Sequence, residues 1–305
     1  MHIHHHWQDI APSARGASVA LGNFDGIHLG HQAVLDLARG PAPLGVVTFE
    51  PHPRQYFAPD APPFRLMNAE ARANRLAKLG VEHLFELPFD ATIAAMTPAE
   101  FARDVLSDGL GICHAVVGAD FRFARGRHGT TADLQSLGLT HGFGTTIATL
   151  VQMSGRDISS TAIRDALSAG RPRDAAAMLG HWHRIEGEVI HGEKRGRQLG
   201  YPTANMDVTG LHLPKFGVYA VRVDVLTGPQ AGQYIGAGSL GVRPMFGHNK
   251  PNLESFLFDF AGDLYGHHLS VALVDYLRPE MTFDGLPDLL TQMAADCETA
   301  RRILS

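Results

Sequence analysis

The decapeptide at residues 22–31, Gly-Asn-Phe-Asp-Gly-Ile-His-Leu-Gly-His, constrains the fold of this chain more than any other segment. It follows the apolar run 17–21, which is typical of a buried strand, and precedes residues 32–39, whose pattern indicates a helix. Backbone N–H groups at a helix start attract an anion, and the glycines let the backbone approach it. His28 and His31 lie on one face of such a helix. The segment therefore predicts a phosphate site where either histidine could stabilise charge on a transferred phosphoryl group.

The histidine pair is also compatible with two simpler roles. Histidines at this spacing can supply half of a zinc site, or they can lie solvated on a helix surface. Zinc is disfavoured because the two cysteines, Cys113 and Cys297, are far apart and outside any CxxC pair. No acidic residue stands beside the histidines at the spacing of a zinc protease. A phosphate site remains the better interpretation, and the cysteine usage fits a reducing compartment.

Length and composition limit the class of protein. A chain of 305 residues suits two domains, and 45% hydrophobic with 19% charged residues is ordinary for a globular protein. No apolar run approaches the roughly 20 residues that span a bilayer, and no signal peptide is visible, so we expect a cytoplasmic protein with no membrane contact. The net charge of −5 argues against nucleic acid as a partner. Whether the chain forms a homo-oligomer stays open.

Strand-like and helix-like segments alternate in the first half of the chain. This pattern predicts a Rossmann-like α/β domain with a mainly parallel sheet, in which ligands bind at the carboxyl ends of the strands. The histidine-rich residues 1–7 can be a natural or an added segment and are left out of this prediction. We expect strands at 17–21, 44–49, 83–87, 114–117 and 144–151, and helices at 32–39, 69–79, 98–106 and 161–169.

The pattern changes in the second half to short strands separated by turns. We expect a connector at 171–183, a boundary near residue 180, and therefore one domain at 1–180 and a second at 181–305. Short strands followed by one helix predict a small antiparallel β-barrel with a C-terminal helix. The expected strands are 185–190, 217–226, 234–240, 253–260 and 269–276, and the expected helix is 286–304.

Three more polar segments lie at predicted element ends in the first half. Residues 48–54, Thr-Phe-Glu-Pro-His-Pro-Arg, form either a rigid turn or part of a site. Residues 118–123, Gly-Ala-Asp-Phe-Arg-Phe, put an arginine between aromatic rings, which suits a phosphate and a flat ring, although such a run is more often an exposed charged loop. Residues 158–164, Ile-Ser-Ser-Thr-Ala-Ile-Arg, begin a helix, where Ser160 or Thr161 could be an N-cap and nothing more.

A glycine-rich basic segment at residues 187–205 is the clearest signal of the second half. Its glycines and basic side chains could wrap phosphates, and Thr203 and Asn205 offer two hard oxygen ligands, for which Mg²⁺ is the obvious ion. A glycine-rich surface loop is the alternative. The chain has no GxxxxGK[ST] motif, and the GxGxxG at 236–241 precedes a segment with proline and glycine that cannot continue as a helix. Neither a P-loop nor a dinucleotide fingerprint is therefore expected.

Glu254 is the candidate general base of the second half. Strand alternation places it on one face with Phe256, Phe258 and Phe260. A carboxylate on an aromatic face suits proton abstraction from a hydroxyl. If the strand begins at Ser255 instead, Glu254 is solvated.

Taken together, these motifs resemble those of the prokaryotic bifunctional FAD synthetases, which join an FMN adenylyltransferase to a riboflavin kinase. The resemblance spans about residues 17–304, and residues 196–205 match the kinase signature G-R-x-L-G-(F/Y)-P-T-A-N throughout. It implies that the barrel phosphorylates riboflavin to FMN and that the first domain adenylylates FMN to FAD. ATP is then the co-substrate, Mg²⁺ the cofactor, and FMN and FAD the product ligands.

The resemblance also implies residue roles. The catalytic residues would be His28, His31, Arg164 and Glu254. The residues that bind ATP for adenylyl transfer would be Gly22, Asn23, Phe24, Asp25, Gly30, Ser159, Ser160 and Thr161. The flavin or nucleotide end of that site would hold His52, Arg54, Asp120, Phe121 and Arg122. The kinase would bind its substrates through Gly192, Gly196, Arg197, Gly200, Pro202 and Arg278, and its metal through Thr203 and Asn205.

The chain departs from the family pattern at several positions. Ala124 stands where glycine is usual, and Ser239, Met245 and Phe256 stand where asparagine, threonine and histidine are usual. The last three could lower kinase activity. Two rival functions therefore remain, namely an adenylyltransferase with a weakened or inactive kinase barrel and a noncatalytic flavin-binding regulator.

Overall fold

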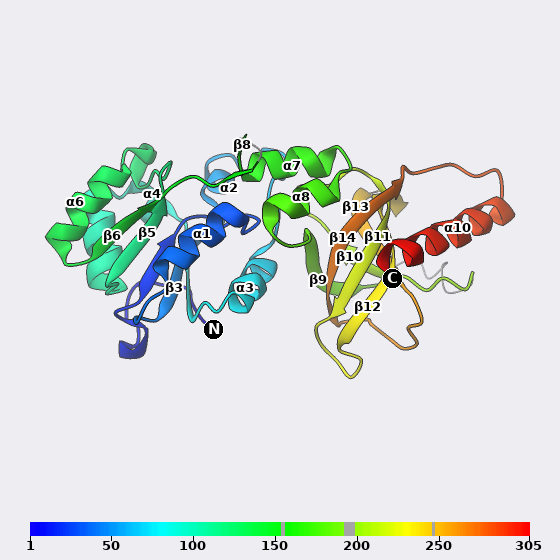
Figure 1. The fold of residues 1–305 in the computed structure, drawn as a ribbon, viewed down its shortest axis with the longest axis horizontal. Coiled ribbons are helices and arrows are strands. Elements are labelled where there is room, and N and C mark those ends of the chain that lie inside the picture. The colour runs from blue at the N-terminus through cyan, green and yellow to red at the C-terminus, as the bar shows by residue number, and fades with distance from the viewer. Residues whose placement is uncertain (154–155, 192–198, 246–247) are drawn as a thin grey trace. The chain divides into compact units, whose positions relative to one another are not determined.

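The computed structural model describes residues 1–153, 156–191, 199–245 and 248–305 (Figure 1). They form two compact units. Unit 1 consists of Met1–Pro62 and Arg72–Ile158, and unit 2 consists of Pro63–Ala71 and Ser159–Ser305. In the described residues, no helix combines the length and the apolar character needed to cross a bilayer.

Unit 1 is built on a six-stranded sheet with the order β1-β4-β3-β2-β5-β6, and every neighbouring pair is parallel. Its strands are β1 His2–His4, β2 Ser18–Leu21, β3 Leu44–Glu50, β4 His83–Pro88, β5 His114–Gly118 and β6 Gly144–Ala148. Its helices are α1 Leu29–Ala38, α2 Pro53–Phe57, α4 Ala91–Ala95, α5 Pro98–Glu100 and α6 Thr131–His141, with a π-helical turn at Phe101–Gly109. Helix α3, Ala69–Lys78, begins in unit 2 and continues in unit 1. The predicted parallel α/β sheet is confirmed.

Unit 2 is a closed antiparallel barrel with the order β10-β13-β12-β11-β14-β9. Its strands are β9 Arg184–Ile190, β10 Ala204–Asp207, β11 Gly217–Val225, β12 Gly232–Met245, β13 His248–Leu257 and β14 His268–Arg278. Helices α7 Ser160–Ser168, α8 Pro172–Leu179 and α10 Leu286–Leu304 complete the unit, while β7 Gln152–Met153 and β8 Arg156–Asp157 form a separate ribbon. Helix α10, red in Figure 1, packs on the outside of the barrel through Ala300 and Leu304. The predicted barrel with a C-terminal helix is confirmed.

Several segments differ from the prediction, among them the following. Residues 172–179 form helix α8 rather than a connector, because Pro172 suits the first turn of a helix and Gly180 ends it in the left-handed conformation. The strand expected at 144–151 stops at Ala148. The histidine-rich start, for which the sequence predicts no element, forms β1 and pairs with β4, with His2 opposite His83.

The segment Pro63–Ala71 belongs to unit 2 although it precedes most of unit 1 in sequence. The backbone carbonyl of Arg65 accepts from the N–H of His212 at 2.7 Å. The Asn68 side chain donates from Nδ2 to the carbonyl of Glu186 at 2.8 Å, and its Oδ1 accepts from Ala71 N–H at the start of α3. The packing also groups α7 and α8 with the barrel, and the domain boundary near residue 180 stays a prediction.

Candidate functional sites

The first site lies where the strand order of unit 1 reverses. The chain proceeds from β2 to β3 on one side and later returns to β5 on the other side of β2. Crevices at the carboxyl ends of two such strands are where open α/β sheets bind ligands. Residues 22–28 follow β2 and residues 119–123 follow β5. Two of the sequence motifs therefore flank this switch point.

The loop after β2 has an unusual backbone that buries its apolar side chains. Phe24, Gly26 and Ile27 all have positive φ angles, of 52°, 87° and 45°. Phe24 is 1% exposed and Ile27 is fully buried, so packing holds a conformation that these residues rarely adopt. The hydroxyl of Thr48 on β3 donates to the carbonyl of Asn23 at 3.3 Å. The loop is thus held by its buried side chains in the core and by a hydrogen bond from β3.

His28 is the N-cap residue of α1. Its Nδ1 accepts the backbone N–H of His31 at 3.3 Å, and the two imidazole rings stack with centroids 3.7 Å apart. Because Nδ1 accepts, the neutral ring carries its proton on Nε2 and can donate from there. In the described part of the chain, Nδ1 of His31 is buried without a hydrogen-bond partner. The pair is therefore held rigidly at the start of a helix, where an anion is stabilised.

Both histidines are neutral at pH 7. Burial lowers the pKa of His28 to about 4, although the nearby charge of Asp120 acts in the opposite direction. Burial also lowers the pKa of His31 well below its ordinary value, and the charge of His28 adds to that effect. Because the charge of Asp120 acts on the pKa of His28, the loop after β5 lies near the decapeptide, and a shared role of the two segments stays a prediction. A neutral imidazole can still donate one hydrogen bond to a phosphoryl oxygen.

The lowered pKa of His28 predicts that stability falls in acid. Below pH 6.5 an unfolded His28 binds a proton that the folded protein rejects, so the free energy of unfolding decreases from about pH 6.5 to about pH 4. In His28→Asn, the asparagine oxygen can replace Nδ1 as the cap of α1, but the side chain cannot titrate. The free energy of unfolding of the variant should therefore fall by about 1–3 kcal/mol less than that of the parent between these pH values. Urea unfolding at pH 7.5 and pH 4.5 measures the difference. An equal loss in both proteins would contradict the assigned burial of His28.

Residues 48–54 form more than a rigid turn. His52 caps α2, since its Nδ1 accepts the N–H of Arg54 at 3.0 Å and its own N–H donates to Gln55 Oε1 at 3.2 Å. Helix α2 buries none of its residues. Tyr56 and Phe57 are 38% and 66% exposed, and both pack edge-on against the ring of Phe89. The sequence analysis missed these two aromatics, although their position directly after the motif was a usable signal.

The loop after β5 exposes polar side chains beside two stacked phenylalanine rings. Asp120 and Arg122 are exposed, while Phe121 is half-buried and stacks on the buried Phe123 at 5.7 Å. Ala124, which stands where the family has glycine, adopts a φ of 63°. A side chain in this region is strained, which explains why glycine is usual there.

Ser159 is the N-cap of α7, and the structure corrects the expected cap at Ser160 or Thr161. The hydroxyl of Ser159 accepts the N–H of Ala162 at 3.2 Å. Arg164 donates from Nε to the carbonyl of Phe64 at 2.6 Å, and its guanidinium lies 5.5 Å from the centre of the Phe64 ring. The helix belongs to unit 2. A role of these residues toward ATP phosphates stays a prediction.

The second site lies on the outer face of the barrel. Asn205 on β10 and Ser239 on β12 both lie directly opposite Glu254 on β13. Asn252 links the first and last of these residues, because its Nδ2 is 3.1 Å from Asn205 Oδ1 and 3.3 Å from Glu254 Oε1. The predicted metal ligand and the predicted base are thus neighbours. Sequence reasoning missed Asn252, although it precedes Glu254 by two residues and so shares its face.

The oxygens at this site suit a hard cation. Asn205 is 8% exposed and its Nδ2 donates to the carbonyl of Thr203 at 3.4 Å, while its Oδ1 and Glu254 Oε1 both accept from Asn252 Nδ2. Mg²⁺ prefers such oxygen ligands. Among the residues that the structure describes, no group of three or more His, Cys, Asp or Glu side chains could hold a metal ion. The donor set fits magnesium better than a transition metal.

The aromatic face around Glu254 is partly as predicted. Phe256 and Phe258 contact each other edge-on on the face that also packs against α10. Tyr201, from the glycine-rich segment, stands edge-on to Phe256 at 5.2 Å. The prediction that Phe260 shares this face is wrong. Strand β13 ends at Leu257, Asp259 has a φ of 58°, and Phe260 packs against the barrel interior.

The remaining kinase residues fall into three groups. Gly192, Gly196 and Arg197 lie outside the described residues. Gly200 has a φ of 83° and Pro202 is exposed, so both belong to the turn that leads into β10. Arg278 forms a forked ion pair with Asp296 of α10, with contacts of 2.7 to 3.0 Å. Its guanidinium therefore ties β14 to α10, and a role in substrate binding stays a prediction.

Comparisons with known proteins agree with this architecture. The model of the FAD synthetase family matches residues 10–162, and the riboflavin kinase model matches residues 179–304. The bifunctional riboflavin kinase/FMN adenylyltransferase of Pseudomonas fluorescens is 40% identical over 301 residues, which cover 97% of this chain and 95% of that protein. The protein of the same name from Escherichia coli K12 is 38% identical over 291 residues, or 94% and 92% of the two chains.

A solved structure extends the likeness to the fold of the whole chain. A crystal structure from Streptococcus pneumoniae, described as that of a macrolide-efflux protein, covers 98% of both chains with a TM-score of 0.81 and 31% identity. A parallel sheet matched by the FAD synthetase model, followed by a closed barrel matched by the riboflavin kinase model, defines the class of two-domain nucleotide-dependent transferases. Within this class, the chain belongs to the family of bifunctional riboflavin kinase/FMN adenylyltransferases, as its motifs indicate.

Proposed function

We propose that this chain converts riboflavin and ATP to FMN in the barrel and FMN and ATP to FAD at the parallel sheet. The observation that carries the proposal is the presence of two separate polar sites of the right chemistry. One is the stacked pair of His28 and His31 at a helix start, and the other is the Asn205–Asn252–Glu254 cluster on the barrel. Family membership supports the pairing of these two activities in one chain.

In adenylyl transfer, a phosphate oxygen of FMN attacks the α-phosphorus of ATP and pyrophosphate leaves. The Nε2–H of His28 would donate to an oxygen of the α-phosphate, where negative charge develops in the transition state. The N–H groups at the start of α1 act in the same direction. Resemblance to the family assigns Arg164 and the hydroxyls of Ser160 and Thr161 to the phosphates that leave.

The flavin would bind over α2 in this reaction. Arg54, Tyr56 and Phe57 are exposed on this short helix. An arginine suits the FMN phosphate, and exposed aromatic rings suit a flat isoalloxazine ring. Asp120, Phe121 and Arg122 of the neighbouring loop are proposed at the same site because Asp120 acts on His28.

In phosphorylation, a ribityl hydroxyl of riboflavin attacks the γ-phosphorus of ATP and ADP leaves. Glu254 would take the hydroxyl proton, and Asn252 orients it by a hydrogen bond to Oε1. Mg²⁺ held by Thr203 and Asn205 would offset the negative charge of the phosphates.

The substitutions in the barrel leave this chemistry in place. Ser239 faces Glu254 directly, so the loss of the usual asparagine shortens one side chain beside the base. Phe256 puts an apolar ring on this face, where the family has a histidine. The side chain of Met245 lies outside the described residues. Because Asn205, Asn252 and Glu254 retain their contacts, the family activity is favoured over a silent barrel or a noncatalytic regulator. The cytoplasmic location stays a prediction, and the oligomeric state stays open.

Purified protein tests the proposed function directly. Riboflavin, ATP and Mg²⁺ should yield FMN and then FAD by chromatography, and added FMN should yield FAD with pyrophosphate. Excess EDTA should abolish both, because the phosphate charge is then not offset. A protein that binds flavin but does not consume ATP would support the regulator instead.

Gly30 allows a further test of the His28 geometry. A Cβ atom at this position would lie 3.0 Å from both Cε1 and Nδ1 of His28, which is closer than ordinary contact. Gly30→Ala should therefore shift the imidazole and lower the kcat of FAD formation by about 10–100-fold, since a donor displaced by an ångström stabilises the transition state poorly. Gly40→Ala is the matched control, because no atom lies within 4 Å of its Cβ position. Equal rates in the two variants would argue against a role of His28.

A further inference from the structure

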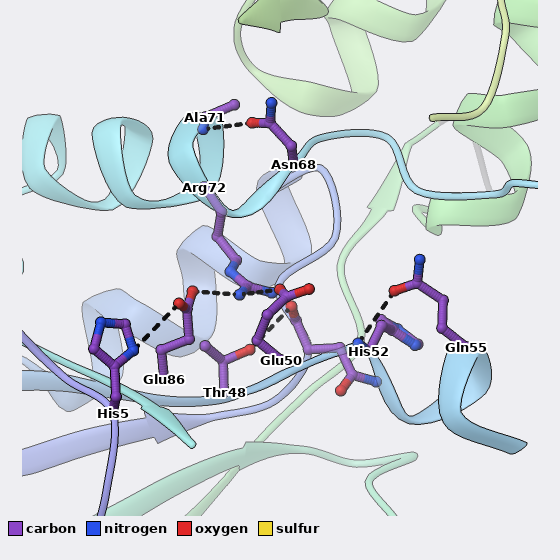
Figure 2. A network of polar contacts seen from close by, with 10 residues as sticks. His5, Thr48, Glu50, His52, Gln55, Asn68, Ala71, Arg72 and Glu86 are labelled. Carbon is purple, nitrogen blue, oxygen red and sulfur yellow. Dashed lines mark hydrogen bonds and ion pairs between the residues drawn. The ribbon is translucent and has the colours of Figure 1, made fainter. Parts of the chain in front are cut away.

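We propose that Arg72 is a positioning residue for adenylyl transfer, which acts by holding Glu50 at the entry to α2. This inference rests on the proposed binding of flavin over α2. The Arg72 side chain is 1% exposed and heads the largest fully buried side chains of the described residues. Its Nη2 donates to Glu50 Oε2 at 2.9 Å and to Glu86 Oε2 at 2.6 Å (Figure 2). Figure 2 shows the guanidinium reaching from α3 to these two carboxylates.

A guanidinium in this position requires its carboxylate partners. Arginine keeps its proton in proteins, and a buried charge without a partner costs several kcal/mol. Glu50 ends β3 and Glu86 lies on the neighbouring β4. The Nδ1 of His5 also lies 3.7 Å from Glu86 Oε1. The guanidinium of Arg72 therefore links the end of β3 to β4. Directly after Glu50, the chain continues into α2, over which we propose that the flavin binds.

Helix α2 benefits from such an anchor because its packing is limited to surface contacts such as those of Tyr56 and Phe57 with Phe89. None of its five residues is buried. Only Pro51 separates Glu50 from His52, the residue that caps the helix. On the same strand, Thr48 is tied to the loop of His28 through the carbonyl of Asn23. The end of β3 is thus bonded to the nucleotide loop through Thr48 and to α3 through Glu50.

The two carboxylates differ in a way that makes the inference testable. The Glu50 side chain is 33% exposed and the Glu86 side chain is 10% exposed. Glu50→Gln would replace the charged bond to Arg72 by a weaker neutral one and so loosen the entry to α2, while Arg72 keeps its charged bond to Glu86 and the fold should survive. Arg72→Lys keeps the positive charge but replaces the planar guanidinium by a point charge. Its KM for FMN should therefore lie between those of the parent and Glu50→Gln.

The decisive measurement is the KM of the full-length enzyme for FMN. Glu50→Gln should raise this KM by about tenfold, the effect of one lost charged hydrogen bond. The KM for ATP and the rate of FMN formation in the barrel should stay within about twofold of the parent. Glu82→Gln is the matched control, because its Oε1 accepts the N–H of Leu44 at the opposite end of the same strand pair. An unchanged KM for FMN, or equal changes in both variants, would overturn the proposal.

A second measurement keeps the inference separate from the proposed function. Amide hydrogen exchange at residues 51–58 should be faster in Glu50→Gln than in the parent, with unchanged protection of β2 and β5. This result does not depend on activity. Faster exchange in a protein that forms no FAD would refute the function alone, whereas unchanged exchange would refute the anchoring role of Arg72.

Discussion

His28→Asn is expected to lower FAD formation from FMN by about 10²–10³-fold, the usual effect of losing one donor to a transition-state oxygen. The asparagine oxygen can replace Nδ1 as acceptor of the His31 N–H, so the start of α1 should be kept. What is lost is the Nε2–H donor. Initial rates with saturating FMN and ATP, followed by chromatography of FAD, measure the effect.

The same chain contains the control for this variant. FMN formation from riboflavin takes place on the barrel and should stay within about twofold of the parent. His114→Asn removes a histidine that begins β5 and bonds Thr146 of β6, far from the carboxyl ends of the strands, and should leave both activities close to those of the parent. Full FAD formation by a folded His28→Asn protein would exclude the histidine as a phosphoryl donor.

Glu254→Gln is expected to have the opposite selectivity. Loss of the general base should lower FMN formation by about 10²–10⁴-fold, while FAD formation from added FMN is retained. Glutamine preserves the shape of the side chain and can still accept from Asn252 Nδ2, so the barrel should fold. The ratio of the two rates, measured on one preparation, reports the effect without correction for active fraction.

Glu298→Gln, at an exposed carboxylate on α10, serves as the charge-matched control and should change neither rate. If Glu254→Gln lowered both activities in a folded protein, two independent sites could not be maintained. If it lowered neither, the base would have to be another group on the barrel.

Local sequence patterns were sufficient to predict which motifs lie at strand ends. In a parallel sheet all carboxyl ends meet at one edge, so motifs after β2, β3 and β5 are brought together by any fold of this class. Alternation in β13 likewise placed Glu254 with Phe256. It failed for Phe260 because Asp259 turns the backbone, and a single positive φ is not visible in a period-two pattern.

Contacts between distant segments were not predictable in the same way. Arg72 looks like an ordinary helix-surface arginine in sequence, and Asn252 like an ordinary strand residue. Their partners are set by strand order and register, which bring Glu50 and Glu86 to one guanidinium and Asn205 opposite Glu254. The histidine-rich start carries no strand signal of its own, and pairing with β4 makes it a strand.

The amino-acid sequence by itself determined the two architectures, the motifs that carry the chemistry and the family, because these depend on local periodicity and on residue types at short spacing. Only the tertiary structure decided that His28 is buried with a neutral ring, that Asn252 bonds both Asn205 and Glu254, and that Arg72 pairs with Glu50 and Glu86. Burial and long-range pairing set the charge state and orientation of these groups, and both arise only when distant segments pack together.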